Sequence, residues 1–269
     1  MKMGTTGRPV ITLTTDFGTS DHYVGTMKGV IASICPDALM VDITHDIPHF
    51  DIWSGAYAIS QAAPFFPEGS IHVVVVDPGV GTARRGISCA FAQQIFIAPD
   101  NGVLSLAIDE ASPHRSRELQ NPKLWLQPAS NTFHGRDLFA PSAAKLAAGL
   151  FPWDEVGPEL DGIVRLPHSK AVEEKQGFWH ACVQSVDHFG NIITNLKAEQ
   201  VSLQNSRFRL SVGGHPVDRF RKTFGEARRD ELFVYAGSSG FYEIGINQES
   251  AAKILGTSPG DSIIIEINA

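Results

Sequence analysis

Two loops in the first half of the sequence carry side chains that could activate water. Asp77 follows an apolar run and precedes a glycine turn and two arginines, Arg84 and Arg85. His134 lies in a second glycine-containing loop, next to an Arg-Asp pair. A carboxylate or an imidazole can orient water and accept its proton, and a guanidinium can hold the carboxylate. By spacing alone, a turn capped by its Asp and arginines that face water is an equally good interpretation.

Two loops in the second half offer groups suited to ligand binding. Asp187 and Asn191 flank Phe189 in one of them, where they could recognise an amine and an adenine-like edge, with Phe189 or Phe224 for stacking. A plain turn is the alternative for this loop. The glycine-serine stretch at 237–240 could hold a carboxylate through its backbone N–H groups and hydroxyls.

Several nucleotide-binding and hydrolase motifs fail in detail. The glycines at 79 and 81 resemble the start of a dinucleotide fingerprint, but Arg84 stands where its third glycine should be. A phosphate-binding P-loop is absent from the sequence. The stretch 237–240 reads GSSG and does not match the nucleophile elbow of serine hydrolases.

One histidine pair has the spacing of a metal site. His45 and His49 are four residues apart and Asp46 lies between them. Pro48 prevents the continuous helix that would place both rings on one face. A loop that shapes the edge of a site is therefore the main interpretation, and a metal-dependent hydrolase built on His45, Asp46 and His49 is an alternative.

Composition excludes several classes of protein. The chain has 269 residues, 43% of them hydrophobic and 19% charged, which is typical of a folded protein. Its formal charge of −7 and the lack of a long basic run argue against nucleic acid as a partner. We find neither an apolar run long enough for a membrane span nor a signal peptide, so we expect a cytoplasmic protein. The three cysteines are expected to be reduced core thiols.

The elements that must position these loops alternate between strands and helices in the first half of the chain. Asp77, for example, follows the β-branched run 71–76, which is typical of a strand buried in a parallel sheet. This order predicts an α/β layer, Rossmann-like, with its ligand site at the carboxyl ends of the strands. We expect strands at 9–15, 39–44, 71–76, 87–91 and 94–98, and helices at 23–34, 52–63 and 142–150.

The second half has a different pattern. Residues 151–177 are rich in proline, glycine and charge, and we place a domain boundary near residue 170. We therefore expect an α/β domain over 1–170 and a second domain over 171–269. Alternating segments predict a small β-barrel or sandwich. We expect its strands at 178–186, 208–212, 231–235, 242–246 and 262–267, and a helix at 248–255.

Seven motifs in the same order resemble one family along almost the whole chain, the S-adenosyl-L-methionine hydroxide adenosyltransferases, which are related to the fluorinase and the chlorinase. These motifs lie at 14–18 with Asp21, 23–29, 77–85, 99–102, 133–137, 187–191 and 238–240. The resemblance implies an N-terminal α/β domain and a C-terminal β-barrel. It also implies a homotrimer whose active sites each lie between domains of neighbouring chains. The reaction that it implies is attack of water on C5′ of S-adenosylmethionine, which releases adenosine and methionine.

The resemblance also assigns roles to residues. Asp77, Arg84 and His134 match the residues that surround the attacking water in the family. His134 paired with Asp77 could accept its proton. Halogenating relatives carry a tyrosine in place of Asp77 and lack the arginine, which favours water over halide as the nucleophile. Because the sulfonium leaves as a neutral thioether, we expect neither a metal nor a cofactor.

The substrate contacts are implied in the same way. Asp16 matches the ligand of the ribose hydroxyls, and Phe50 matches an aromatic residue over the ribose. The adenine contacts correspond to Asn191 and Phe224. The residues that match the methionine end are Asp21, Asp187, Ser238 and Ser239. Ser239 replaces an arginine of the halogenating branch, and the 187–191 loop is one residue shorter than theirs.

The alternative in another functional class is a protein that senses an adenosine compound without turning it over.

Overall fold

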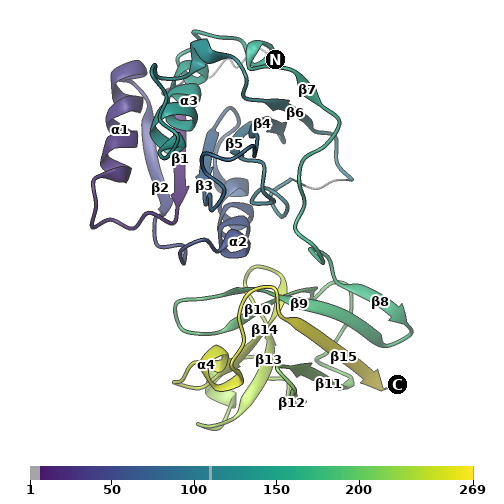
Figure 1. Ribbon diagram of the computed structural model, residues 1–269. Coiled ribbons are helices and arrows are strands. Elements are labelled where there is room, and N and C mark those ends of the chain that lie inside the picture. Colours follow the sequence, from purple (N-terminus) through teal and green to yellow (C-terminus); the bar gives the residue numbers. More distant parts are fainter. Residues whose placement is uncertain (1–6, 109–110, 269) are drawn as a thin grey trace. The chain divides into compact units, whose positions relative to one another are not determined.

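A computed structural model describes residues 7–108 and 111–268 of the chain. The chain divides into two compact units between Leu166 and Pro167, close to the change in sequence texture that precedes residue 170. We call these unit 1 and unit 2 and describe each by itself (Figure 1). No helix in the described residues is long and apolar enough to cross a membrane.

Unit 1 is built on a seven-stranded mixed sheet with the order β2-β1-β3-β5-β4-β6-β7. The strands β2, β1, β3 and β5 are parallel, and β4, β6 and β7 continue the sheet in antiparallel pairs. The strand bounds are β1 Val10–Thr15, β2 Leu39–Thr44, β3 Ile71–Val75, β4 Gly86–Phe91, β5 Gln94–Pro99, β6 Arg115–Glu118 and β7 Glu159–Leu160.

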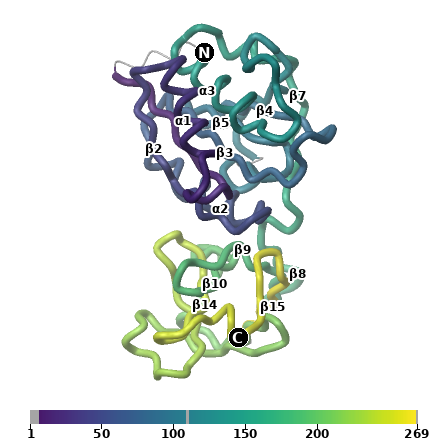
Figure 2. The backbone as a smooth tube through the Cα atoms, turned by 60° about the vertical axis from the view of Figure 1, so that its left-hand side comes forward, coloured from purple at the N-terminus to yellow at the C-terminus, as the bar shows by residue number. Residues whose placement is uncertain are grey.

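Helices cover both faces of this sheet because its central strand is apolar on both sides. Val73 of β3 belongs to one core with helices α1 (Tyr23–Ile34) and α3 (Ala140–Ala147), which lie side by side (Figure 2). Val74 points to the other face and packs into a second core with α2 (Ile52–Ala62). Successive side chains of a strand point to opposite faces, so one β-branched run supplies both cores.

Short helical turns complete unit 1. Three-residue 3₁₀ turns occur at Ala63–Phe65, Pro122–Leu124 and Trp153–Glu155. A single π-helical turn, Gly135–Phe139, leads directly into α3, and His134 stands at its start.

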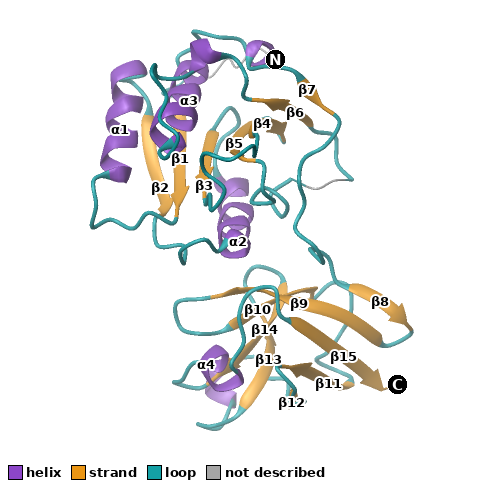
Figure 3. Ribbon diagram, in the orientation of Figure 1, coloured by secondary structure: helices purple, strands orange, loops and turns teal. Residues whose placement is uncertain are grey.

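Unit 2 is an eight-stranded antiparallel sheet with the path β12-β11-β15-β9-β10-β14-β13, and β8 also pairs with β9 (Figure 3). The bounds are β8 Val172–Lys175, β9 Phe178–Val186, β10 Ile192–Lys197, β11 Arg207–Val212, β12 His215–Val217, β13 Leu232–Ala236, β14 Phe241–Ile246 and β15 Ser262–Asn268. A 3₁₀ turn, Phe224–Glu226, and the helix α4, Ala251–Leu255, connect strands.

The two ends of this path almost meet. The segment after β12 hydrogen-bonds to β13, where Arg221 N donates to Val234 O over 3.0 Å and Val234 N donates to Arg219 O over 2.7 Å. The sheet therefore curls into a nearly closed barrel around a core that includes Val183, Leu210 and Ile265. This is the expected combination of an α/β unit and a smaller β-barrel unit.

The strands and helices expected from the sequence are present with small shifts in their ends, and five strands were not expected. These are β6, β7, β8, β10 and β12. The helix expected from Gln248 begins at Ala251, because Gln248 has a φ of 65° and the Ser250 hydroxyl caps the helix by accepting from Lys253 N. All three cysteines are buried free thiols, as expected.

Candidate active site

Three neighbouring strands of unit 1 end at one edge of the sheet. β1 pairs in parallel with β2 and β3, and Thr15 of β1 lies opposite Val75 of β3. Because the carboxyl ends of parallel strands share an edge, the loops that contain Asp16, His45 and Asp77 leave the sheet together (Figure 1). Ligands of open α/β sheets bind at this edge.

Arg84 contacts both Asp77 and His134 there. Arg84 Nε donates to both carboxylate oxygens of Asp77, over 2.9 and 3.0 Å, and Arg84 Nη2 also bonds to Asp77 Oδ2. The same Nη2 lies 2.7 Å from His134 Nδ1. Only 5% of the Asp77 side chain and 10% of the Arg84 side chain are exposed. Screening by water is weak in such a setting, so the ion pair holds its geometry firmly.

The local backbone explains why Arg84 reaches His134. Gly81 has a φ of 77°, and a Cβ on it would lie 2.4 Å from the backbone oxygen of Asn131. Glycine therefore allows the loop after β3 to approach the loop that carries His134. The guanidinium of Arg84 also lies 5.3 Å from the centroid of the Phe139 ring, which supports it from the side of the π-helical turn.

The adjacent arginine serves a different carboxylate. Arg85 Nε and Nη2 donate to Asp100 Oδ2 over 2.9 and 2.5 Å. Asp100 in turn accepts from Val164 N, so this second pair ties the loop after β5 to the end of unit 1. The two arginines, which spacing alone could not tell apart, thus have separate partners.

The contact with Arg84 defines the state of His134. A guanidinium only donates hydrogen bonds, so Nδ1 must accept, and the proton of the neutral ring is on Nε2. Burial lowers the pKa of His134, and the positive charge of Arg84 lowers it further, against a smaller opposite effect of Asp77 and Asp137. The sequence suggested that His134 pairs with Asp77, whereas in the structure Arg84 bridges the two side chains.

The ribose residues inferred from the resemblance lie on neighbouring loops of unit 1. Asp16 is 8% exposed, and its Oδ2 accepts from Phe50 N over 2.9 Å. Phe50 is 69% exposed and has a φ of 67°. Asp21, expected at the methionine end, is exposed and has no hydrogen bond to another residue in the described ranges.

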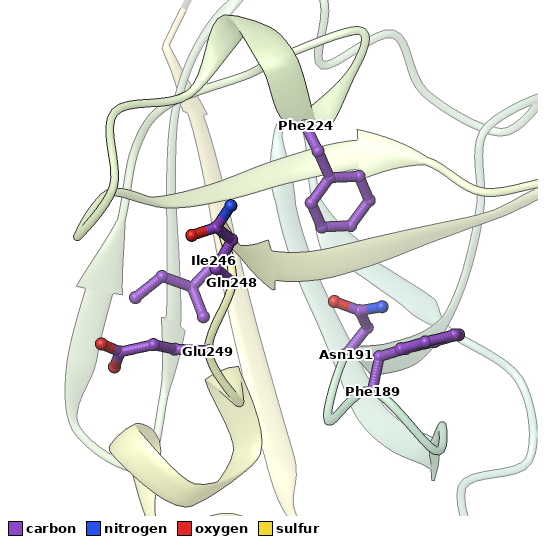
Figure 4. A pocket seen from close by; sticks show the side chains of 6 residues that line it. All are labelled: Phe189, Asn191, Phe224, Ile246, Gln248 and Glu249. Atoms are coloured by element: carbon purple, nitrogen blue, oxygen red, sulfur yellow. The ribbon is translucent and has the colours of Figure 1, made fainter.

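Unit 2 contains a cavity of about 450 Å³, in the size range of small-molecule sites. Its lining comes from three segments of the chain, as Figure 4 shows. The lining residues are Phe189, Asn191, Phe224, Ile246, Gln248 and Glu249. The two adenine residues inferred from the resemblance, Asn191 and Phe224, therefore line one cavity.

A hydrogen bond orients the Asn191 amide in this cavity. Asn191 Nδ2 donates to Asp187 Oδ2 over 2.8 Å, which leaves Oδ1 on the side of Ile246 (Figure 4). Asp187 Oδ1 accepts from the backbone of Phe189 and of Asn191, so the carboxylate also forms the turn that the sequence offered as the alternative. An amide oxygen that faces the cavity can accept from an exocyclic amine such as that of adenine.

The glycine-serine loop at 237–240 contacts a buried carboxylate, Glu243, that was not expected from the sequence. Ser239 Oγ is 3.5 Å from Glu243 Oε1, and Tyr235 Oη donates to Glu243 Oε2 over 2.5 Å. Burial raises the pKa of Glu243 despite the bond from Tyr235. Ser238, at the tip of the turn, is exposed. A single charged residue in the otherwise apolar strand β14 was the signal that could have identified Glu243.

The histidines of the possible metal site do not converge. His45 Nδ1 is 2.8 Å from Thr15 Oγ1, whereas His49 Nδ1 is 3.1 Å from Asp16 O. Asp46 is exposed. In the part of the chain that the structure describes, no group of three or more His, Cys, Asp or Glu side chains is arranged to hold a metal ion.

Known proteins resemble this chain along its length. Residues 11–157 match the SAM hydroxide adenosyltransferase N-terminal domain, and residues 181–264 match the C-terminal domain of the same family. A protein of Salinispora tropica named (R)-S-adenosyl-L-methionine hydrolase is 40% identical over 95% of this chain and 97% of its own length. A protein of Actinoplanes named fluorinase is 33% identical over 72% of this chain and 74% of its own.

A solved structure has the same fold. A protein of Thermotoga maritima superposes with a TM-score of 0.83 at 37% identity and covers 95% of this chain and 99% of its own. The sequence matches the models of both domains of one family, in the order expected from the motifs, so the similarity extends beyond the fold. The chain belongs to the SAM hydroxide adenosyltransferase family.

Proposed function

We propose that the protein hydrolyses S-adenosyl-L-methionine to adenosine and L-methionine. The oxygen of water, or of hydroxide, forms a bond to C5′ of the ribose while the bond from C5′ to sulfur breaks. The electron pair of that bond stays on sulfur, so methionine leaves as a neutral thioether, and one proton of the water is released. The reaction needs a placed and activated water more than it needs an acid at the leaving group.

The observation that carries this proposal is the bridge that Arg84 makes between Asp77 and His134. In the proposed mechanism, Asp77 orients the water and accepts its proton, and the charge of Arg84 stabilises the developing hydroxide. His134 donates from Nε2 and keeps the water in line with C5′. A placed base of this kind contributes about 10² to 10⁴ in rate.

The remaining residues bind the substrate in our proposal. Asn191 and Phe224 hold adenine in the cavity of unit 2, and Asp16 and Phe50 hold the ribose. We assign the methionine end to Asp21, Asp187, Ser238 and Ser239. Because the resemblance implies active sites that combine both domains, we also propose a homotrimer in which each site receives residues from unit 1 and unit 2.

The test is product analysis with purified protein in ¹⁸O-labelled water. We expect adenosine and methionine in equal amounts, with the label in the 5′-hydroxyl of adenosine. Because several relatives are named (R)-S-adenosyl-L-methionine hydrolase, the two sulfonium diastereomers should be assayed separately. Unlabelled adenosine would rule out attack by water. Recovery of intact ligand from folded protein would instead favour a sensor of adenosine compounds.

A further inference from the structure

The loop that follows β2 binds the last residue of β1 and the segment after it through four contacts. Gly18 N donates to His45 O over 2.8 Å, and His49 Nδ1 lies 3.1 Å from Asp16 O. Phe50 N donates to the Asp16 carboxylate, and the His45 ring bonds to the side chain of the residue before Asp16. The histidines that the sequence offered as metal ligands thus contact Asp16 and the residue before it.

Thr15 connects His45 to both sides of Asp16. Its hydroxyl lies 2.8 Å from His45 Nδ1 and accepts from Phe17 N over 3.2 Å. Thr15 is fully buried, and His45 is 5% exposed. The residue before Asp16 thus carries a hydroxyl that the backbone of the residue after it binds, and the buried ring of His45 contacts the same hydroxyl.

A carboxylate near the other nitrogen of the His45 ring indicates which nitrogen carries the proton. Asp42 Oδ1 lies 3.0 Å from His45 Nε2. Burial acts to raise the pKa of Asp42, but the bond from Lys28 and the nearby His45 ring outweigh it and lower this pKa, so Asp42 is charged at neutral pH. His45 Nε2 does not meet the geometry of a hydrogen bond in the described residues, but a negative charge 3.0 Å away favours a proton on this nitrogen. Nδ1 of the neutral ring then accepts from the Thr15 hydroxyl.

The Asp16 carboxylate is left with one oxygen for a ligand. Oδ2 accepts from Phe50 N, and no other described residue is bound to Oδ1. A hydrogen bond to a hydroxyl is strong only when the carboxylate is held to within about half an ångström. Such precision requires support from residues that do not touch the ligand.

We infer that His45 is a positioning residue for the ribose end of the site, acting through Thr15 to fix Asp16. This inference rests on the proposed function, because it takes the ligand of Asp16 to be a ribose hydroxyl. If His45 only stabilised the fold, its replacement would weaken the binding of all ligands to the same extent. If His45 positions Asp16, its replacement would instead weaken the binding of those ligands that carry the ribose hydroxyl.

The experiment compares the binding of adenosine and 2′-deoxyadenosine by calorimetry, which does not depend on turnover. We expect the wild type to prefer adenosine by about tenfold or more, as one well-placed hydrogen bond to a charged group provides. His45→Leu and Thr15→Val should lose most of this preference through weaker binding of adenosine. Affinity for 2′-deoxyadenosine should change less than about threefold.

Conservative variants provide the matched comparison. His45→Asn places an amide oxygen near the position of Nδ1, and Thr15→Ser keeps the hydroxyl, so both variants should retain most of the preference. His180→Asn is the control on the surface of unit 2, where half of the side chain is exposed. Asp16→Asn should lose the preference for adenosine. Adding His45→Leu to Asp16→Asn should reduce that preference no further, because the effects of substitutions at coupled residues are not additive.

The possible outcomes separate the two proposals. If folded His45→Leu and Thr15→Val both keep the preference, the inference is wrong, whereas release of adenosine from S-adenosylmethionine by the wild type would still support the proposed function. Thr15→Val changes the shape of the buried side chain very little, so it decides the question if His45→Leu does not fold. Wild-type protein that neither binds adenosine nor turns over S-adenosylmethionine would overturn both proposals.

Discussion

Arg84 donates from Nη2 to Nδ1 of His134 over 2.7 Å, and this contact determines which nitrogen of the imidazole carries the proton. Since Nδ1 accepts, the neutral ring presents N–H at Nε2. Protonation of Nδ1 would replace this bond with a contact between two positive groups. The neutral form of His134 is thus the form that fits the site.

The pH dependence of activity should reveal this relationship. Burial and Arg84 lower the pKa of His134 below its ordinary value of 6.5, so the ring stays neutral when the pH falls below 6.5. We expect kcat/KM to be constant around neutral pH and to fall only as the pH drops through the lowered pKa. His134→Gln should lack this acid limb. An acid limb at or above pH 6.5 in the wild type would contradict the assignment.

Replacement of Arg84 by lysine should be costly although the charge is kept. The guanidinium binds Asp77 through two nitrogens and His134 through one of them, and a single ammonium cannot reproduce that geometry. We expect Arg84→Lys to lower kcat by about 10²-fold, with a smaller change in KM. Arg115→Lys is the control, because half of its side chain is exposed in an ion pair with Glu159. Equal activities of the two variants would show that the geometry of the guanidinium is unimportant.

The cavity of unit 2 depends on the absence of a side chain at Gly245. A Cβ there would lie 3.1 Å from Asn191 Oδ1, from Phe224 Cε1 and from Tyr235 Cε1. Gly245→Ala should displace the amide and the ring that we assign to adenine, and we expect adenosine to bind about tenfold more weakly.

Gly29→Ala is the matched control for Gly245→Ala. A Cβ at Gly29, in the middle of α1, would meet no atom within 4 Å. We expect unchanged binding and a gain of about 0.5–1 kcal/mol in the free energy of unfolding, because alanine is favoured in helices. Both quantities can be measured by calorimetry and by chemical denaturation. Unchanged adenosine affinity in Gly245→Ala would remove Gly245 from the description of the cavity.

His72 should make unit 1 sensitive to acid. Its ring is fully buried in β3, and burial lowers its pKa to about 4 from 6.5. The unfolded chain binds a proton below pH 6.5, but the folded chain does so only near pH 4, so folding loses stability as the pH falls across this range. The free energy of unfolding should fall by about 3 kcal/mol across this pH range.

His72→Asn tests this expectation because the asparagine amide lies near the position of Nδ1 and can still bond to Thr12 Oγ1, which now lies 2.8 Å from His72 Nδ1. Denaturation at a series of pH values should show a shallower decline for the variant than for the wild type between pH 6.5 and about 4. Parallel declines would mean that His72 takes up its proton in the folded state at its ordinary pKa.

Local patterns in the sequence were sufficient for most elements of unit 1. β3 and α1 have the expected bounds to within a residue, since a β-branched run and a helical apolar spacing are properties of consecutive residues. β6 and β7 were not expected because they are short and polar and lie at one end of the sheet, with β7 as the edge strand. Their pairing partners define them more than their own side chains do.

The motifs determined the family, and through it the candidate residues. They could not determine how those residues contact one another. Asp77 and His134 are 57 positions apart, and only the folded chain places Arg84 between them while Arg85 turns to Asp100. The sequence likewise supplied His45 as a possible metal ligand, and only the parallel pairing of β1 with β2 brings it to Thr15. Hydrogen-bond partners depend on distances across neighbouring strands and loops, which the order of residues along one chain does not contain.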